Sequence, residues 1–212
     1  MFRPHIRALF VLFIMALSAC GTEEIDPATL SGPPALDLEN GERVLASASC
    51  PEDAHKSTCP GAAMPDFELA DFQDDSPYLG ETYGLSRFEG NVTIVTLWAA
   101  WCSYCRGQAE IMEMIKTEVL EAGREINFAS INVTSGVEAQ PLLAEICSFP
   151  LLQDTDEVAA WDLMGGSKDD MYIYGTDGKL LIYLKASSEI STRLSTIGGY
   201  ANVRDALMAA TE

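Results

Sequence analysis

The chain has 212 residues and a hydrophobic content of 48%, which suffices for one well-packed domain with extensions but not for two full domains. Its formal net charge is −19, because 13 Lys and Arg face 32 Asp and Glu. A surface this acidic repels nucleic acid and anionic headgroups, so we expect no nucleic-acid partner. The acids are spread along the chain, as on a solvated surface, and we expect a monomer.

Residues 1–19 have the pattern of a secretory signal, with Arg3 and Arg7 ahead of an apolar run too short to span a bilayer. Small residues then lead to Cys20, which resembles the bacterial lipobox, where this cysteine becomes the diacylated first residue. Cleavage there removes two arginines and no acid, so the mature charge is 11 − 32 = −21. We expect Cys20 to anchor the protein to the bacterial cell envelope, and Gly21 favours the outer membrane, facing the periplasm. The alternative is an ordinary signal peptide with an incidental cysteine.

Residues 20–63 are rich in Pro, Ser, Ala, Glu and Asp and predict a flexible tether. With Cys20 lipidated, five cysteines remain in an oxidising compartment, so at least one lacks an intramolecular partner. Cys50 with Cys59 is the simplest structural disulfide, and a bridge from either of them to Cys147 is the alternative. Otherwise Cys147 is a buried thiol or an additional resolving cysteine.

Residues 64–212 predict a single α/β domain. A β-branched apolar run at 92–98 and a second at 126–133 predict buried strands. Apolar spacing predicts helices over 104–122, 137–146, 158–163 and 200–210, and residues 171–174 and 180–184 predict a hairpin around Asp177-Gly178. Parallel strands need covering crossovers, which these helices supply, and the order is that of a thioredoxin-like fold with a central mixed sheet flanked by helices.

The strongest chemical signal is the Cys102-Ser-Tyr-Cys105 pair, where a buried strand runs into a helix. One helical turn brings the two sulfurs within bonding range, and the positive end of the helix favours the Cys102 thiolate. We predict Cys102 as the nucleophile, more exposed than Cys105, and Cys105 as the resolving thiol, with Trp98 and Trp101 flanking them. Zinc needs about four ligands, and the chain after the signal holds one histidine, His55, so we expect neither a metal nor an organic cofactor.

A longer stretch is similar to the N-terminal thioredoxin-like domain of selenoprotein P. The similar segments are Asn91-Val-Thr-Ile-Val-Thr-Leu-Trp98, Phe149-Pro-Leu-Leu-Gln-Asp154, Val158-Ala-Ala-Trp161 and Gly166-Ser-Lys-Asp-Asp-Met-Tyr-Ile-Tyr174. The cysteine pair itself, in Trp98-Ala-Ala-Trp-Cys-Ser-Tyr-Cys105, resembles the active-site turn of thioredoxin-like reductases. In that domain selenocysteine takes the first active-site position, which falls on Cys102 here. The resemblance implies thiol redox activity, including reduction of hydroperoxides.

Most thioredoxins carry a cis-proline opposite the cysteine pair, and aligning the hairpin places Asp169 at that position. A cis bond before a non-proline residue costs about 3 kcal/mol, so we expect a trans bond and a reshaped groove. We place the substrate groove along Trp101, Ser103, Tyr104, Asp169 and Asp170. A carboxylate near Cys102 would oppose thiolate formation, and the alternative for Asp169 is a turn or cap residue.

These observations predict a membrane-anchored thiol/disulfide oxidoreductase that acts on a protein disulfide or a small oxidant and takes electrons from an unidentified donor. One alternative is a peroxidase like selenoprotein P, although Ala99 stands where peroxiredoxins place a threonine. A second alternative is a non-catalytic binding lipoprotein whose Cys102–Cys105 pair is a structural disulfide.

Overall fold

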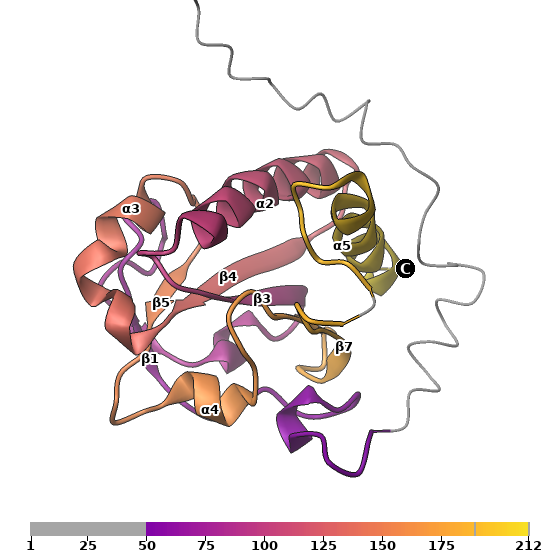
Figure 1. The fold of residues 1–212 in the computed structure, drawn as a ribbon, viewed down its shortest axis with the longest axis horizontal. Helices are drawn as coiled ribbons and strands as arrows, with labels where there is room; N and C mark the ends of the chain where they lie inside the picture. The colour runs from indigo at the N-terminus through magenta and orange to yellow at the C-terminus, as the bar shows by residue number, and fades with distance from the viewer. Residues whose placement is uncertain (1–49, 189, 212) are drawn as a thin grey trace, which may run out of the picture.

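The computed structural model describes residues 50–188 and 190–211, so the predicted signal, Cys20 and most of the tether lie outside the described residues. A seven-stranded mixed sheet forms the centre, in the order β2-β1-β5-β4-β3-β6-β7. Helices cover both faces of this sheet (Figure 1). The predicted α/β class, with a mixed sheet flanked by helices, is therefore confirmed.

The central strand β3 (Val92–Trp98) is buried along its whole length. It pairs in parallel with β4 (Ile126–Asn132) on one side and antiparallel with β6 (Met171–Tyr174) on the other. Its side chains alternate between two apolar clusters, one on each face of the sheet. Burial on both faces explains why this strand reads as a continuous apolar run instead of an alternating one.

Two long helices cover one face of the sheet. α2 (Ser103–Glu121) follows β3 after a short loop, and α5 (Ile197–Ala210) packs beside it (Figure 1). The other face is covered by the short helices η3 (Leu85–Phe88) and α4 (Ala160–Met164). The N-terminus of α2 therefore lies close to the C-terminal end of β3, and the cysteine pair lies at this junction.

The predicted hairpin is present as β6 and β7 (Leu180–Leu184). The single helix predicted over 137–146 is wrong: the chain forms η4 (Thr134–Ala139) and then α3 (Gln140–Ala144). Pro141 lies in the first turn of α3, where proline is tolerated because its missing N–H has no intrahelical partner to bond. The prediction also missed three short strands: β1 (Leu69–Asp71), β2 (Thr82–Tyr83) and β5 (Leu151–Gln153).

The segment ahead of residue 64 is part of the domain. Cys50 and Cys59 form a disulfide around η2 (Lys56–Thr58), and the Ser57 hydroxyl donates to the backbone carbonyl of Leu163. Ala63 then bridges Lys179 in the hairpin. The tether predicted for residues 20–63 therefore does not include residues 57–63, because this stretch bonds to α4 and to the hairpin.

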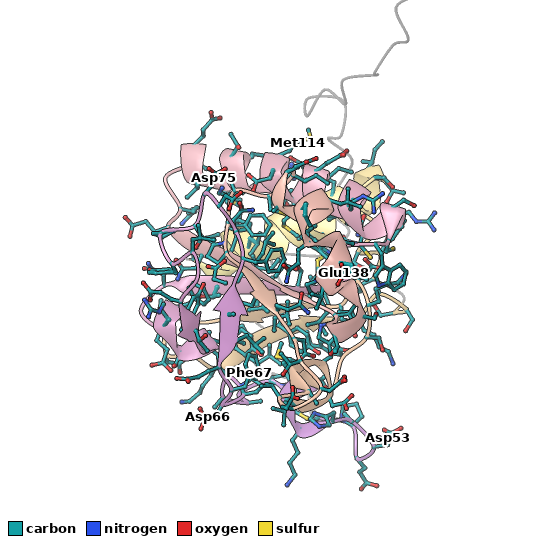
Figure 2. All side chains as sticks on the ribbon, turned by 90° about the vertical axis from the view of Figure 1, so that its left-hand side faces the viewer. Asp53, Asp66, Phe67, Asp75, Met114 and Glu138 are labelled. Carbon is teal, nitrogen blue, oxygen red and sulfur yellow. A yellow bond between two sulfur atoms is a disulfide. The ribbon has the colours of Figure 1, made fainter. Side chains whose placement is uncertain are left out.

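Exposed acidic side chains lie far apart on the surface, as Asp53, Asp66, Asp75 and Glu138 show in Figure 2. Within the described residues, no helix has the length and apolarity needed to cross a membrane.

Candidate active site

Cys102 is the N-cap of α2, the position where a helix presents unpaired backbone N–H groups. Its Sγ accepts a hydrogen bond from the backbone N–H of Cys105 at 3.3 Å. Both cysteines are free thiols in this structure. A sulfur at this position is stabilised as a thiolate by the N–H donor and by the positive end of the helix dipole.

The two thiols differ in exposure and in acidity. The exposed fraction is 8% for Cys102 and 0% for Cys105. Burial raises the pKa of Cys102, but the Cys105 thiol, the Cys105 N–H and Lys168 outweigh it, so the net pKa lies below its ordinary value. Burial raises the pKa of Cys105 strongly, and both Cys102 and Asp169 raise it further. Cys102 therefore loses its proton more readily than Cys105 does.

A cation that the sequence analysis did not identify completes the nucleophile's surroundings. The Lys168 ammonium donates to the Cys102 Sγ at 3.4 Å and lies 6.0 Å from the centre of the Trp101 ring. One feature of the sequence could have identified Lys168: it precedes Asp169 in the loop that aligns opposite the cysteines. Its contact depends on the backbone conformation of that loop, which no residue pattern displays.

The loop that carries Lys168 extends the pairing of β6 with β3. The Asp169 N–H donates to the Leu97 carbonyl at 2.8 Å, and the Leu97 N–H donates to the Asp170 carbonyl at 3.0 Å. The peptide bond before Asp169 is trans, as expected, and Asp169 adopts a left-handed backbone with φ of 72°. Aspartate tolerates this region better than most residues, which explains its presence here.

Asp169 is buried, and it acts on Cys105 instead of on Cys102. Burial raises the pKa of the Asp169 carboxyl group, while Cys105 and Lys168 lower it, and the net pKa is raised. One carboxyl oxygen, Oδ1, is buried with no hydrogen-bond partner. Asp169 therefore does not oppose the Cys102 thiolate as the sequence suggested; it faces the second cysteine.

Asp170 holds this loop in place. Its buried carboxyl group accepts hydrogen bonds from the Ser167 N–H at 2.7 Å, the Tyr183 hydroxyl at 2.5 Å and the Ala186 N–H at 2.8 Å. These three donors come from both sides of the hairpin. Asp170 is thus a buried brace and does not line the groove as the sequence suggested.

The rim of the site is aromatic. Trp101 and Tyr104 are exposed by 53% and 41%, and Ser103 lies exposed between the cysteines. Trp98 does not flank the site as predicted, because it is wholly buried and packs against Phe149 in the core.

The loop before Cys102 is fixed from β4. The Asn132 side chain accepts from the Ala100 N–H at 2.9 Å and donates to the Gln153 side chain at 2.7 Å. Arg106 donates to the Ala100 carbonyl at 2.9 Å. Both backbone polar groups of Ala100 are thus satisfied, which pre-orders the loop that presents the nucleophile.

The other cysteines lie apart from this pair. Cys50 and Cys59 are bonded to each other, and Cys147 is a buried free thiol whose pKa is raised by burial. Cys147 therefore does not bridge Cys50 or Cys59. The predicted lipidation site, Cys20, lies outside the described residues.

The chain is similar to a known family and to several known proteins. The AhpC/TSA family matches residues 60–181, more than half of the chain. The thiol-disulfide oxidoreductase ResA of Oceanobacillus iheyensis is 27% identical over 165 residues, which span 75% of this chain and 80% of that protein. Selenoprotein P of Mus musculus is 29% identical over 114 residues, which span 50% of this chain but only 30% of that protein. The resemblance to selenoprotein P is therefore partial.

Among solved structures, a candidate thiol:disulfide interchange protein DsbE from Chlorobium tepidum superposes with a TM-score of 0.56 at 19% identity. The match covers 76% of this chain and all of that one. This likeness confirms the thioredoxin-like fold.

Proposed function

Because the chain belongs to the AhpC/TSA family, we propose that it is a thiol/disulfide oxidoreductase in which Cys102 is the nucleophile and Cys105 the resolving thiol. The likeness to ResA over most of both chains supports this reading. One observation carries it: two sulfurs one helical turn apart have opposite shifts in pKa, and only the one with the lowered pKa reaches the surface. A structural disulfide needs neither property.

The proposed reaction proceeds through a mixed disulfide. The Cys102 thiolate attacks one sulfur of a substrate disulfide; a bond forms between Cys102 and that sulfur, and the other half leaves as a thiolate. Cys105 then attacks the Cys102 sulfur, which releases the second half and closes the Cys102–Cys105 disulfide. The substrate is reduced to two thiols, the protein is oxidised by two electrons, and a dithiol reductant restores the protein.

The second step needs a base, because burial keeps Cys105 protonated. We assign this task to Asp169, which is buried, acts on Cys105 and has a raised pKa suited to accepting a proton. Asp169 takes the Cys105 proton as the sulfur attacks, and the departing thiolate takes a proton in turn. Lys168 meanwhile stabilises the Cys102 thiolate before attack.

Single-turnover kinetics test this function. Pre-reduced protein is mixed with insulin or a small disulfide, and closure of the Cys102–Cys105 bond is followed by alkylation and mass spectrometry. We expect Cys102→Ser to abolish the reaction and Cys105→Ser to accumulate the mixed disulfide. Cys147→Ser is the matched control and should react as the wild type does. A Cys102→Ser variant that still reduces disulfides contradicts the proposal.

Reduction of hydroperoxides is a second candidate, supported by the partial similarity to selenoprotein P. Here the Cys102 thiolate attacks the peroxide oxygen to give a sulfenic acid and an alcohol, and Cys105 displaces water to form the disulfide. Comparing cumene hydroperoxide with insulin as oxidant for the pre-reduced protein separates the two activities. Faster closure of the disulfide with the hydroperoxide favours this candidate.

We also propose that the protein is anchored to the bacterial cell envelope through a diacylated Cys20, on the outer membrane. The signal pattern in residues 1–19 and the small residues before Cys20 support this proposal. Metabolic labelling with a fatty acid tests it, with Cys20→Ser as the unlabelled control. Equal labelling of the two proteins contradicts the anchor.

A further inference from the structure

A polar cleft of about 470 Å³ lies beside the cysteine pair. Tyr104 of α2, Asp169 and residues of the segment after β7 line it. This segment contributes three hydroxyl groups and one cation to the cleft, from Ser188, Ser191, Thr192 and Arg193. Its volume is that of a small-molecule site, and its lining of hydroxyls and charges suits a polar ligand.

Buried polar side chains fix the part of the cleft that Ser191, Thr192 and Arg193 line. Gln108, on the helix that carries the cysteines, donates to the Thr192 carbonyl at 3.0 Å and accepts from the Leu194 N–H at 2.9 Å. Asn202 of α5 donates to the Ser191 carbonyl at 2.9 Å. Gln108 and Asn202 are both buried, so these hydrogen bonds hold the wall at a set position relative to Cys105. The cleft is therefore formed before a ligand arrives.

Two ionisable side chains of the cleft, Asp169 and Arg193, can each form a further polar contact. The Oδ1 atom of Asp169 is buried and has no hydrogen-bond partner. The guanidinium of Arg193 forms no ion pair within the described residues, and it lies 6.0 Å from the centre of the Tyr104 ring. A buried carboxyl oxygen without a partner costs free energy, which an N–H donor on a ligand would recover. An unpaired arginine at a cleft is suited to a carboxylate.

We propose that this cleft is a substrate subsite for the disulfide of an amino-acid or short-peptide thiol, with a carboxylate on Arg193 and an N–H group at Asp169. The proposal rests on the proposed oxidoreductase function and specifies its substrate class. Tyr104 lies between the two cysteines in the sequence and Asp169 acts on Cys105, so a ligand in this cleft is held next to the cysteine pair. The reaction is the one already described: the bound disulfide gives two thiols, and Cys102 and Cys105 form a disulfide.

Four small disulfides with different charges test the proposal. Dithiodipropionate carries two carboxylates, cystine carries carboxylates and ammonium groups, cystamine carries ammonium groups alone, and 2-hydroxyethyl disulfide is neutral. Pre-reduced protein is mixed with each probe at about 0.15 M salt, where long-range attraction is largely screened. The second-order rate constant for closure of the Cys102–Cys105 bond is then compared between the wild type and Arg193→Gln.

We expect Arg193→Gln to slow the reaction with dithiodipropionate and cystine about fivefold, the upper range for an exposed ion pair. The rates with cystamine and 2-hydroxyethyl disulfide should stay within a factor of two. Arg193 is not among the groups that shift the pKa of Cys102, so the nucleophile itself is unchanged by the substitution. Arg87→Gln is the control for the change in net charge. Arg87 lies in η3, before the start of β3, whereas Cys102 lies beyond the other end of that strand, so this variant should alter none of the four rates.

Three outcomes overturn the inference while the proposed function stands. One is an equal loss for all four probes, and another is no loss for the carboxylate probes. The third is slower reduction of insulin in Arg193→Gln with dithiodipropionate unaffected, which would assign the cleft to a protein chain. The proposed function itself fails if all four probes and insulin oxidise the wild type no faster than they oxidise Cys102→Ser.

Discussion

The Nζ atom of Lys168 lies 3.4 Å from the Sγ atom of Cys102. The next residue, Asp169, acts on the other sulfur of the pair. Two adjacent side chains of opposite charge thus act differently on the two thiols: Lys168 lowers the pKa of Cys102, whereas Asp169 raises the pKa of Cys105.

Lys168→Gln should raise the pKa of Cys102, because it removes a cation that stabilises the thiolate. The pH profile of iodoacetamide alkylation reports this pKa. Loss of thiolate stabilisation also destabilises the reduced form, so the reduction potential should fall by roughly 10–20 mV, which corresponds to the strength of an exposed ion pair.

Lys56→Gln is the matched control, because it removes the same charge from a lysine in η2, outside the cysteine site. It should leave both the alkylation profile and the potential unchanged. An unaltered profile in Lys168→Gln would show that the ammonium contact does not tune the nucleophile.

Asp169→Asn should slow the resolving step and stabilise the fold at neutral pH. The folded state raises the pKa of Asp169, so as pH rises from the ordinary value of about 3.9 to the raised one, the folded protein keeps a proton that the unfolded chain has lost. Stability therefore falls as pH rises through this interval. Asparagine has no such penalty and tolerates the left-handed backbone.

Thermal unfolding at neutral pH and at a pH below the ordinary carboxyl pKa checks this sign. The melting temperature of Asp169→Asn should exceed that of the wild type at neutral pH and match it in acid. A lower melting temperature at neutral pH would mean that the ionised Asp169 is stabilised in the fold.

Asn132→Ala should cost about 1–3 kcal/mol in unfolding free energy, because it leaves the buried Ala100 N–H without a partner. It should also slow the attack by Cys102, since the preceding loop loses its brace. Asn127→Ala is the matched control: Asn127 donates to the Phe88 carbonyl at the opposite end of the same strand. This control should lose stability without a change in the rate of Cys102 alkylation.

Native-state alkylation should distinguish the three free thiols. We expect iodoacetamide at neutral pH to modify Cys102 and to spare Cys105 and Cys147, because burial raises the pKa of both of the latter. Denaturant should expose all three. Modification of Cys147 before Cys102 in the native protein would contradict the assigned accessibility.

Long apolar patterns predicted the elements that form the centre of the fold. The run at 92–98 and the hairpin around Asp177-Gly178 lie where the structure has β3, β6 and β7. The strands β1, β2 and β5 were missed because two or three residues carry no periodic signal. Their pairing is decided by contacts with distant segments.

The cysteine pair of the site was recognisable from spacing, whereas its electrostatic environment was not. Lys168 reaches Cys102 only because Asp169 is left-handed and Asp170 ties the loop to Tyr183 and Ala186. Such contacts follow from backbone geometry and from hydrogen bonds between segments, which a residue pattern cannot encode.

The positive φ of Asp169 separates this site from ordinary thioredoxins by more than one side chain. Proline locks φ near −65°, whereas Asp169 has φ of 72°. Exchanging the aspartate for proline therefore cannot recreate the usual groove unless the peptide planes on both sides rotate as well. Glycine is the residue that accepts both values of φ, so only a glycine at position 169 would leave the loop free to take up either backbone.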